Sequence, residues 1–289
     1  MYFTSQNEVN RWLSILNDMV EKRSFDQECS PQFIKPFHLV LLALSIKKHD
    51  IEHIDLGEDI QKYATRMHLW DAAGLEPPYE INERDCSQRL VPVHAIEKME
   101  DIDLVSKAFE GIAKHHYEDG ESNDFGTVIS ELLDNCYRHA ERSKGLYGLA
   151  CVQAWENGQK GQLCIADTGI GIRNALSQNE SYSERLKNSN ACEMAVEYGI
   201  SGKLGNGHSG YGLALTKDII DLNQGSLFVI SGHEGLNSKS GFSREFSLNF
   251  PWNGTLIILE WNLNKPLDSK PVYESWPSED ENNEFDDLF

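Results

Sequence analysis

Two polar residues four positions apart are suited to phosphoryl chemistry. Glu131 and Asn135 lie in the stretch ELLDNCYRHA at 131–140, and on a helix their side chains emerge one turn apart on the same face. Arg138 follows three positions after Asn135, close to the same line. A carboxylate that deprotonates a hydroxyl, an amide oxygen that coordinates Mg²⁺ and a cation for phosphate oxygens are parts that phosphoryl transfer uses. By itself, this spacing is more often a solvated helix face.

A second stretch, IADTGIGI at 165–172, ends a predicted strand with an aspartate. Gly169 and Gly171 follow Asp167 and permit tight backbone turns and the close approach of a ligand. The Asp167 carboxylate can accept a hydrogen bond from an exocyclic amino group, which would select adenine over guanine. Taken alone, the stretch is equally consistent with an ordinary glycine turn after a strand.

A third stretch, GHSGYGLAL at 207–215, supplies backbone amides just before a predicted helix. Gly207, Gly210 and Gly212 leave these amides accessible, and the positive end of the helix favours anions. The stretch has neither the Lys-Ser/Thr ending of a Walker loop nor the spacing of a dinucleotide fingerprint. The three stretches in this order therefore describe one nucleotide pocket more strongly than any of them does alone.

Together they resemble the N, G1 and G2 boxes of the GHKL ATPases, the group that contains DNA gyrase, a heat-shock chaperone, histidine kinases and mismatch-repair ATPases. The resemblance covers about 105–262. It implies an α/β Bergerat two-layer sandwich, in which a mixed sheet is backed by helices. It also implies that ATP and Mg²⁺ bind between the sheet and a mobile lid.

The resemblance assigns a role to each matching residue. Glu131 matches the acidic position that acts as base in hydrolysing members, Asn135 the Mg²⁺ ligand and Asp167 the adenine contact. Gly254 and Thr255 resemble a Gly-Thr pair that helps to hold adenine. The implied close approaches of the backbone to the nucleotide are at Gly169, Gly171, Gly210 and Gly212.

The implied lid spans 173–209. Its segment 191–203 resembles the lid of bacterial regulators more than that of gyrase, and Lys203 is either a phosphate contact or a solvated loop lysine. Arg138 matches a basic residue that is common in the N boxes of histidine kinases and is a further candidate nucleotide contact.

Hydrophobic periodicity predicts the elements that hold these stretches. Ser5 and Glu8 form a capping box at the start of an amphipathic helix. The largely apolar run from Phe37 to Ile46 predicts a buried strand. We expect helices at about 6–22, 58–73, 101–120, 123–140 and 213–223, and further strands at 51–57, 146–155, 161–167, 226–231, 244–250 and 254–263.

These elements suggest three regions: an N-terminal α/β unit at 1–100, a GHKL ATP-binding domain at 101–264 and a flexible acidic tail at 265–289. The first region slightly resembles the STAS-like domains found beside bacterial ATP-binding regulators. Residues 273–289 contain seven acidic and no basic residues. This segment is either a solvated tail or one that docks on a basic partner.

Composition narrows the class of protein. With 289 residues and 40% hydrophobic content, the chain can bury a full core. A net charge of −20 argues against a nucleic-acid partner. No apolar run approaches the roughly 20 residues of a membrane span, and no secretory pattern opens the sequence, so we expect a cytoplasmic protein without a membrane partner. The six scattered cysteines are expected to be free thiols.

Three functions fit these observations. The first is an ATP-driven switch or slow ATPase that regulates a protein partner. The second is a serine or histidine protein kinase similar to the anti-sigma-factor kinases. The third is a non-catalytic antitoxin or defence-system protein with a structural nucleotide. The expected partner is a regulated target, a phosphoacceptor or a toxin, held by 273–289 or by the N-terminal unit. The sequence leaves open whether the chain forms a homodimer.

Overall fold

A five-stranded antiparallel sheet forms the centre of the computed structural model, which describes residues 3–80, 88–117, 123–139, 145–202 and 210–276. The strand order is β3-β4-β5-β7-β6. The strands are β3 (Leu90–Ile96), β4 (Gly148–Trp155), β5 (Lys160–Asp167), β6 (Ser226–Lys239) and β7 (Phe242–Asn262). The expected fold class is confirmed, but every neighbouring pair in this sheet is antiparallel rather than mixed. Three of the four pairs, β3-β4, β4-β5 and β6-β7, join strands that are consecutive in the chain. The two expected strands at 244–250 and 254–263 are merged into β7.

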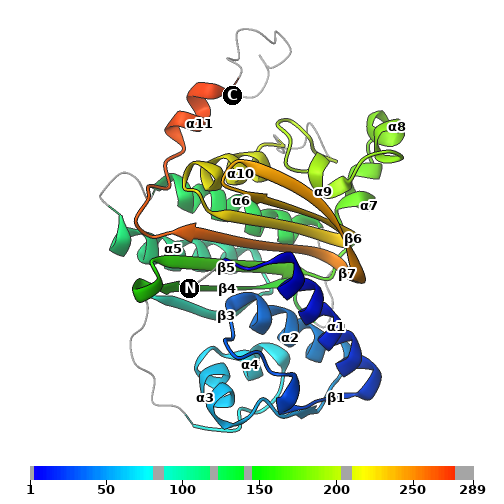
Figure 1. Cartoon of the computed structure of the whole chain (residues 1–289), viewed down its shortest axis with the longest axis vertical. Helices are drawn as coiled ribbons and strands as arrows, with labels where there is room; N and C mark the ends of the chain where they lie inside the picture. Colours follow the sequence, from blue (N-terminus) through cyan, green and yellow to red (C-terminus); the bar gives the residue numbers. More distant parts are fainter. Residues whose placement is uncertain (1–2, 81–87, 118–122, 140–144, 203–209, 277–289) are drawn as a thin grey trace.

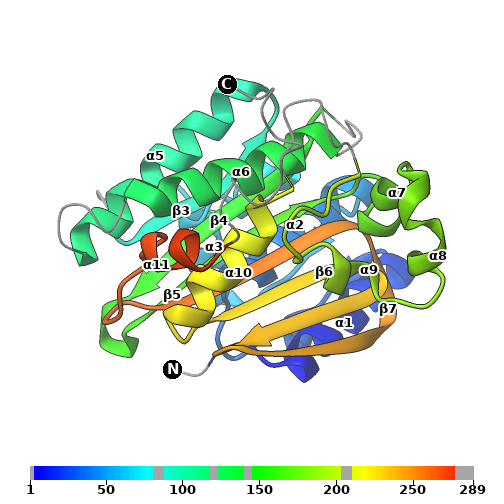
Figure 2. The same cartoon turned by 90° about the horizontal axis from the view of Figure 1, so that it is seen from above.

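Three helices cover one face of the sheet: α5 (Met99–His116), α6 (Asn123–His139) and α10 (Gly212–Leu222) (Figure 2). Alternate residues of the strands point into this layer, including Ile165 and Ile257. The neighbouring residues Ala166 and Ile258 point to the opposite face, where they belong to a second core. The sheet is therefore buried on both sides, which explains why its strands are apolar without strict alternation.

The N-terminal helices form the layer on the second face (Figure 1). These are α1 (Gln6–Lys22), α2 (Pro36–His49) and α4 (Leu69–Ala73). The chain between them contains β1 (Ser24–Phe25), η1 (Gln27–Cys29), β2 (His53–Ile54) and α3 (Glu58–Arg66), with β1 and β2 paired in parallel. The helices α5, α6 and α10 with the sheet make the expected two-layer sandwich, and α1, α2 and α4 add a third layer.

The expected strand at Phe37–Ile46 is wrong, because this run is the interior of α2. Pro36 occupies the first turn, where its missing N–H costs nothing, and Lys35 precedes it as the N-cap. Every residue from Pro36 to Ile46 is buried. A helix buried on all sides has no polar stripe, so its apolar run has no helical period and resembles a strand. The helix expected at 6–22 is confirmed, with Ser5 Oγ accepting from Glu8 N.

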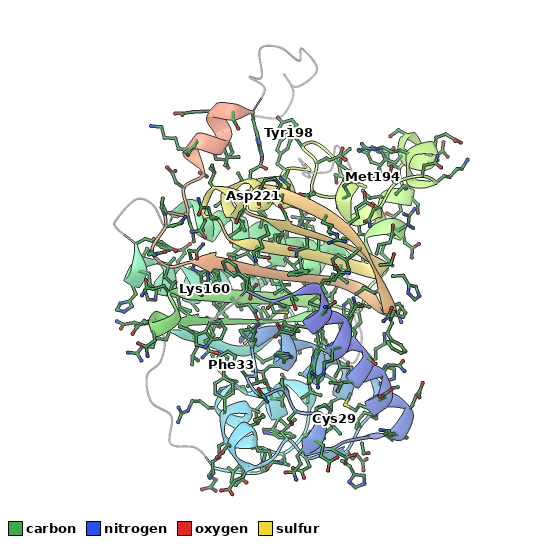
Figure 3. The ribbon with its side chains drawn as sticks, viewed as in Figure 1. Cys29, Phe33, Lys160, Met194, Tyr198 and Asp221 are labelled. Atoms are coloured by element: carbon green, nitrogen blue, oxygen red, sulfur yellow. The ribbon has the colours of Figure 1, made fainter. Side chains whose placement is uncertain are left out.

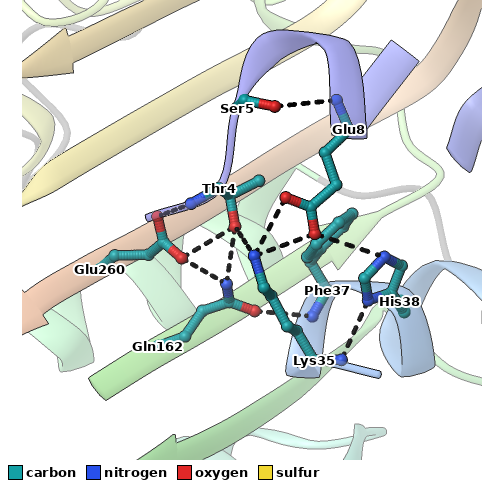
Figure 4. A network of polar contacts seen from close by, with 8 residues as sticks. All are labelled: Thr4, Ser5, Glu8, Lys35, Phe37, His38, Gln162 and Glu260. Carbon is teal, nitrogen blue, oxygen red and sulfur yellow. Dashed lines mark hydrogen bonds and ion pairs between the residues drawn. The ribbon is translucent and has the colours of Figure 1, made fainter. Parts of the chain in front are cut away.

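A buried polar network joins the N-terminal layer to the sheet (Figure 4). Glu260 on β7 accepts from Thr4 N at 2.7 Å, from Thr4 Oγ1 at 2.8 Å and from Gln162 Nε2 at 2.7 Å. Lys35 Nζ lies 2.9 Å from Glu8 Oε1 and donates to Thr4 Oγ1 at 3.1 Å. Burial raises the pKa of Glu260, while the charge of Lys35 and these hydrogen bonds lower it. Because an unpaired charge is costly in a core, the network favours one register of the N-terminal layer on the sheet.

The expected boundary between the first two regions stays a prediction, as does the likeness to STAS-like domains. β3 falls within 1–100 but is the edge strand of the central sheet, paired with β4. The five cysteines in the described residues are free, as expected, while Cys86 lies outside those residues. No helix in the described part of the chain is long and apolar enough to span a membrane.

Candidate functional site

The helix α6 presents Glu131 and Asn135 to a cavity between the sheet and the segment that follows β5. Its apolar side is buried in the core beneath the sheet through Val128, Ile129 and Leu133. Glu131 and Asn135 therefore stand one turn apart on the same face, as their spacing predicted, and both line the cavity. Arg138 does not line it: its Nε is paired with Asp134 Oδ2 at 2.5 Å.

Asp167 closes β5 at the inner end of the cavity and is only 4% exposed. Its Oδ1 accepts from Gly169 N at 2.7 Å and from Thr255 N at 3.1 Å. Its backbone carbonyl accepts from Trp252 Nε1 at 3.0 Å. The turn after β5 and the strand β7 thus each donate a backbone N–H to the carboxylate and hold it in one orientation. Trp252, also on β7, supports the backbone of the same residue.

The Gly254-Thr255 pair lies directly against Asp167. Gly254 has a φ of +126°, and a Cβ built there would lie 2.2 Å from the Asp167 carbonyl oxygen. Only glycine fits this approach without displacing the backbone of β5. The close approach is what lets Thr255 N reach the Asp167 carboxylate and line the cavity.

Gly171 is the second position where glycine is required. Its φ is +77°, and a Cβ would lie 2.6 Å from Ser231 Oγ on β6. That hydroxyl donates to Gly254 O at 2.8 Å and accepts from Ile172 N at 2.9 Å. Ser231 therefore links the turn after Asp167 to β6 and β7, a role that its sequence context does not reveal.

We call the three sequence stretches at 131–140, 165–172 and 207–215 the first, second and third signatures. The third signature meets the first at the start of α10. A Cβ on Gly212 would lie 3.2 Å from Glu131 Cβ and 3.6 Å from Asn135 Nδ2. Gly210 lines the same cavity next to the backbone of Gly199 and Ile200. The amino end of α10 thus faces the two polar side chains of α6. Because a helix is positive at its amino end, this part of the cavity is suited to an anion. Lys203 and Gly207 lie outside the described residues.

Apolar side chains form the walls between these polar groups. These lining residues come from the strands, the helices and the expected lid, so the cavity has apolar walls on more than one side. They are Leu132, Ile165, Ile172, Leu176, Ala195, Ile257 and the less buried Ile200 and Leu213. Leu132, Ile165, Ile172 and Leu213 lie within the three signatures, whereas the other residues carry no local signal in the sequence.

The segment after Gly171 contains α7 (Ile172–Ser177), η3 (Glu180–Tyr182), α8 (Ser183–Leu186) and α9 (Ala191–Met194). Arg173 joins this segment to β6 by an ion pair with Glu234 Oε1 at 2.5 Å. It also donates to Ser189 O at 2.7 Å, which connects the two ends of the segment. Glu234 also accepts from Ala191 N at 3.1 Å. The first part of the expected lid is therefore anchored at both of its ends.

The model of the histidine kinase-, DNA gyrase B- and HSP90-like ATPase family matches residues 120–254. This part of the chain is a GHKL-type ATP-binding domain. The match includes all three signatures, and the Bergerat sandwich agrees with it. No curated protein matches the chain. The cavity described above lies between the three signatures of this GHKL domain, so we assign it as the candidate ATP site.

The GHKL domain holds an aspartate with a perturbed pKa in this site. Burial raises the pKa of Asp167 to about 6, although hydrogen bonds from Gly169 and Thr255 work in the opposite direction. The neighbouring Cys136 thiol has its pKa raised by burial and by the charge of Asp167, so it stays neutral at pH 7. An amino group that donates to the carboxylate would offset the cost of burying its charge.

This shift predicts how stability depends on pH. A carboxyl whose folded-state pKa lies above its unfolded value binds more protons when folded, so the free energy of unfolding falls as pH rises between the two values. For Asp167 the interval runs from its ordinary value of 3.8 to about 6, which corresponds to about 3 kcal/mol. We expect the nucleotide-free wild type to lose up to this much stability, relative to Asp167→Asn, across that interval.

Urea unfolding of both proteins across the interval measures the difference. Other titrating groups are common to the two chains and cancel in the comparison. If the free energy of unfolding depends on pH in the same way in both proteins, the pKa of Asp167 is an ordinary one.

Proposed function

We propose that the chain is a Mg²⁺-dependent ATP switch or slow ATPase that regulates a protein partner. The observation that carries this proposal is the position of Glu131. This carboxylate lines the candidate site beside Asn135 and lies against Gly212 at the start of α10. An acidic side chain at the phosphate end of a nucleotide site serves turnover, because it adds nothing to the binding of an anion.

Adenine would be held at the Asp167 end of the site. The buried carboxylate would accept a hydrogen bond from the exocyclic amino group of the base, and the ring would lie against apolar residues of the sheet such as Ile165 and Ile257. Guanine carries a carbonyl oxygen at the position of that amino group, so it would place an acceptor against the carboxylate. The site is therefore expected to prefer ATP and ADP over GTP.

The phosphates would lie at the amino end of α10. Backbone N–H groups at Gly210 and Gly212 would donate to them, and Glu131 would orient and deprotonate the attacking water. The donor set fits Mg²⁺, which binds through one or two protein oxygens together with phosphates and waters. The Asn135 amide oxygen would hold the ion, which supplies charge neutralisation of the phosphate oxygens when bound.

A partner-regulated role is supported by the third layer of the fold. The network of Glu8, Lys35, Gln162 and Glu260 joins the N-terminal helices to β5 and β7 (Figure 4). The strand β5 ends in Asp167, and β7 contains Thr255. A partner bound to the N-terminal layer would thus act on strands that hold adenine. The chemical nature of the partner, whether target or toxin, stays a prediction from the sequence.

Protein kinase activity is the second candidate, and the exposure of Glu131 supports it. This side chain is exposed rather than buried, so a serine or histidine of a partner could reach it in place of water. The two candidates differ in the destination of the γ-phosphate. Free phosphate indicates an ATPase, and phosphate retained on a partner indicates a kinase.

Isothermal titration with ATP, ADP and GTP tests the binding step. With Mg²⁺ present, we expect ATP and ADP to bind at least roughly tenfold more tightly than GTP, the effect of one hydrogen bond turned into a repulsion. Chelation of Mg²⁺ with EDTA should weaken ATP more than ADP, because ATP offers one more phosphate to the ion. Absence of ATP binding in Mg²⁺ would contradict the proposed function.

A further inference from the structure

After its last strand, the chain packs against α10, whose amino end borders the candidate ATP site. Beyond β7, Leu267 and Val272 are buried in the same core as α6 and α10. The short helix α11 (Lys270–Ser275) packs beside α10, as Figures 1 and 2 show. This C-terminal segment, 263–276, is therefore part of the folded GHKL sandwich even though it lies beyond the residues that the family model matches.

Four aromatic rings from three segments meet where this C-terminal segment ends. Tyr198 follows α9 in the lid, Tyr211 lies between Gly210 and Gly212, and Tyr273 and Trp276 belong to the C-terminal segment. Tyr198 and Tyr211 stack, with ring centroids 4.5 Å apart and planes at 24°. Figure 3 shows Tyr198 at the same end of the molecule as α11.

Trp276 contacts each of the other rings. Its ring centroid lies 4.7 Å from that of Tyr198, edge to face, and 5.6 Å from that of Tyr211. Tyr273 is 5.7 Å away. The indole Nε1 donates to Asp218 Oδ2 on α10 at 3.1 Å. The hydrogen bond fixes the indole on α10, so its ring can hold the two stacked tyrosines in place.

Both tyrosines are next to backbone that lines the site. Tyr211 separates Gly210 from Gly212, and Tyr198 precedes Gly199 and Ile200, where Gly210 makes its closest approach to the lid. A shift of the stacked pair therefore moves the lid and the phosphate end of the site together. Trp276 touches both sides of this junction and does not line the site itself.

We infer that Trp276 is a positioning residue that holds the lid segment on the third signature and so sets how long a nucleotide stays bound. This inference rests on the nucleotide binding proposed above. The residues that follow Trp276 would be coupled to the site through this ring. Six of them are acidic. A partner that binds those residues would act on the ring that holds the lid.

The dissociation rate of a fluorescent nucleotide, mant-ADP, tests the inference by stopped flow. In Trp276→Ala we expect dissociation to be roughly tenfold faster, the effect of losing two aromatic contacts, with little change in the association rate. Trp276→Phe keeps a ring and should restore most of the slow release. Glu274→Ala, an exposed change two residues earlier on α11, is the matched control and should release mant-ADP at the wild-type rate.

A double-mutant cycle separates this role from simple stabilisation. Tyr198 is 40% exposed, so Tyr198→Ala should fold, and it should speed release by a similar factor. If Trp276 acts through this ring, the double variant releases no faster than the faster single variant. If the effects of the two substitutions on the dissociation rate are additive, the inference is overturned. It is also overturned if Trp276→Ala folds and loses thermal stability but releases mant-ADP at the wild-type rate. A wild type that fails to bind mant-ADP would overturn both it and the proposed function.

Discussion

Asp167→Asn is expected to weaken ADP binding by roughly 30- to 150-fold, the effect of about 2–3 kcal/mol for one buried hydrogen bond replaced by a mismatch. The amide oxygen of asparagine can keep the bonds from Gly169 N and Thr255 N, which both go to Oδ1 in the wild type. Its NH₂ group then faces the amino group of adenine, so two donors oppose each other. Isothermal titration with ADP in Mg²⁺ measures the loss.

Because Asp167→Asn keeps its backbone partners, the nucleotide-free variant should fold like the wild type by circular dichroism. Asp134→Asn is the matched control, since Asp134 lies on α6 but pairs with Arg138 outside the cavity lining. Its ADP affinity should equal that of the wild type. Equal ADP affinity in Asp167→Asn itself would show that adenine is held elsewhere.

Glu131→Ala is expected to lower the rate of ATP turnover by about 10²–10⁴-fold, the usual contribution of a general base. ATP binding should persist, because the adenine contacts at Asp167 and Thr255 lie on other elements and are unchanged. Removing a negative charge near the phosphates favours the anion, so ATP binding should be equal to or tighter than that of the wild type. Phosphate release at saturating ATP, or phosphate transfer if a partner is found, measures the rate.

Asp134→Ala again serves as the comparison, as it removes a carboxylate from the same helix one turn before Arg138. It should leave turnover unchanged. Undiminished turnover in Glu131→Ala would show that another group activates the nucleophile and would remove the main support for an active enzyme.

The local parts of the candidate site could be predicted from the sequence. Glu131 and Asn135 share a face because a helix places residues four apart one above the other, whatever the rest of the chain does. The glycine after Asp167 and the glycines before α10 are likewise short-range features, and the family match to 120–254 agrees with them. Arg138 shows the limit of such reasoning: it lies on the predicted helix, but its partner Asp134 is on its own helix and not in the site.

The elements of the N-terminal region could be predicted only in part. The amphipathic helix at 6–22 has a polar face, so its period is visible. The run in α2 has none, because the sheet and the helices around it bury all of its sides. Strand and helix then differ only in long-range contacts that a local pattern does not contain.

By itself, the sequence predicted the family of the ATP-binding domain and placed Glu131, Asn135 and Asp167 in its candidate site, because each signature is a short-range arrangement of helix spacing or glycine backbone freedom. Only the tertiary structure decided what supports those residues. Trp252 and Ser231 hold the turn at Asp167 and Gly171, the network around Lys35 joins the N-terminal layer to the sheet, and Trp276 reaches the third signature from the far end of the chain. These partners are brought together by burial between segments distant in sequence, and spacing along the chain does not encode such contacts.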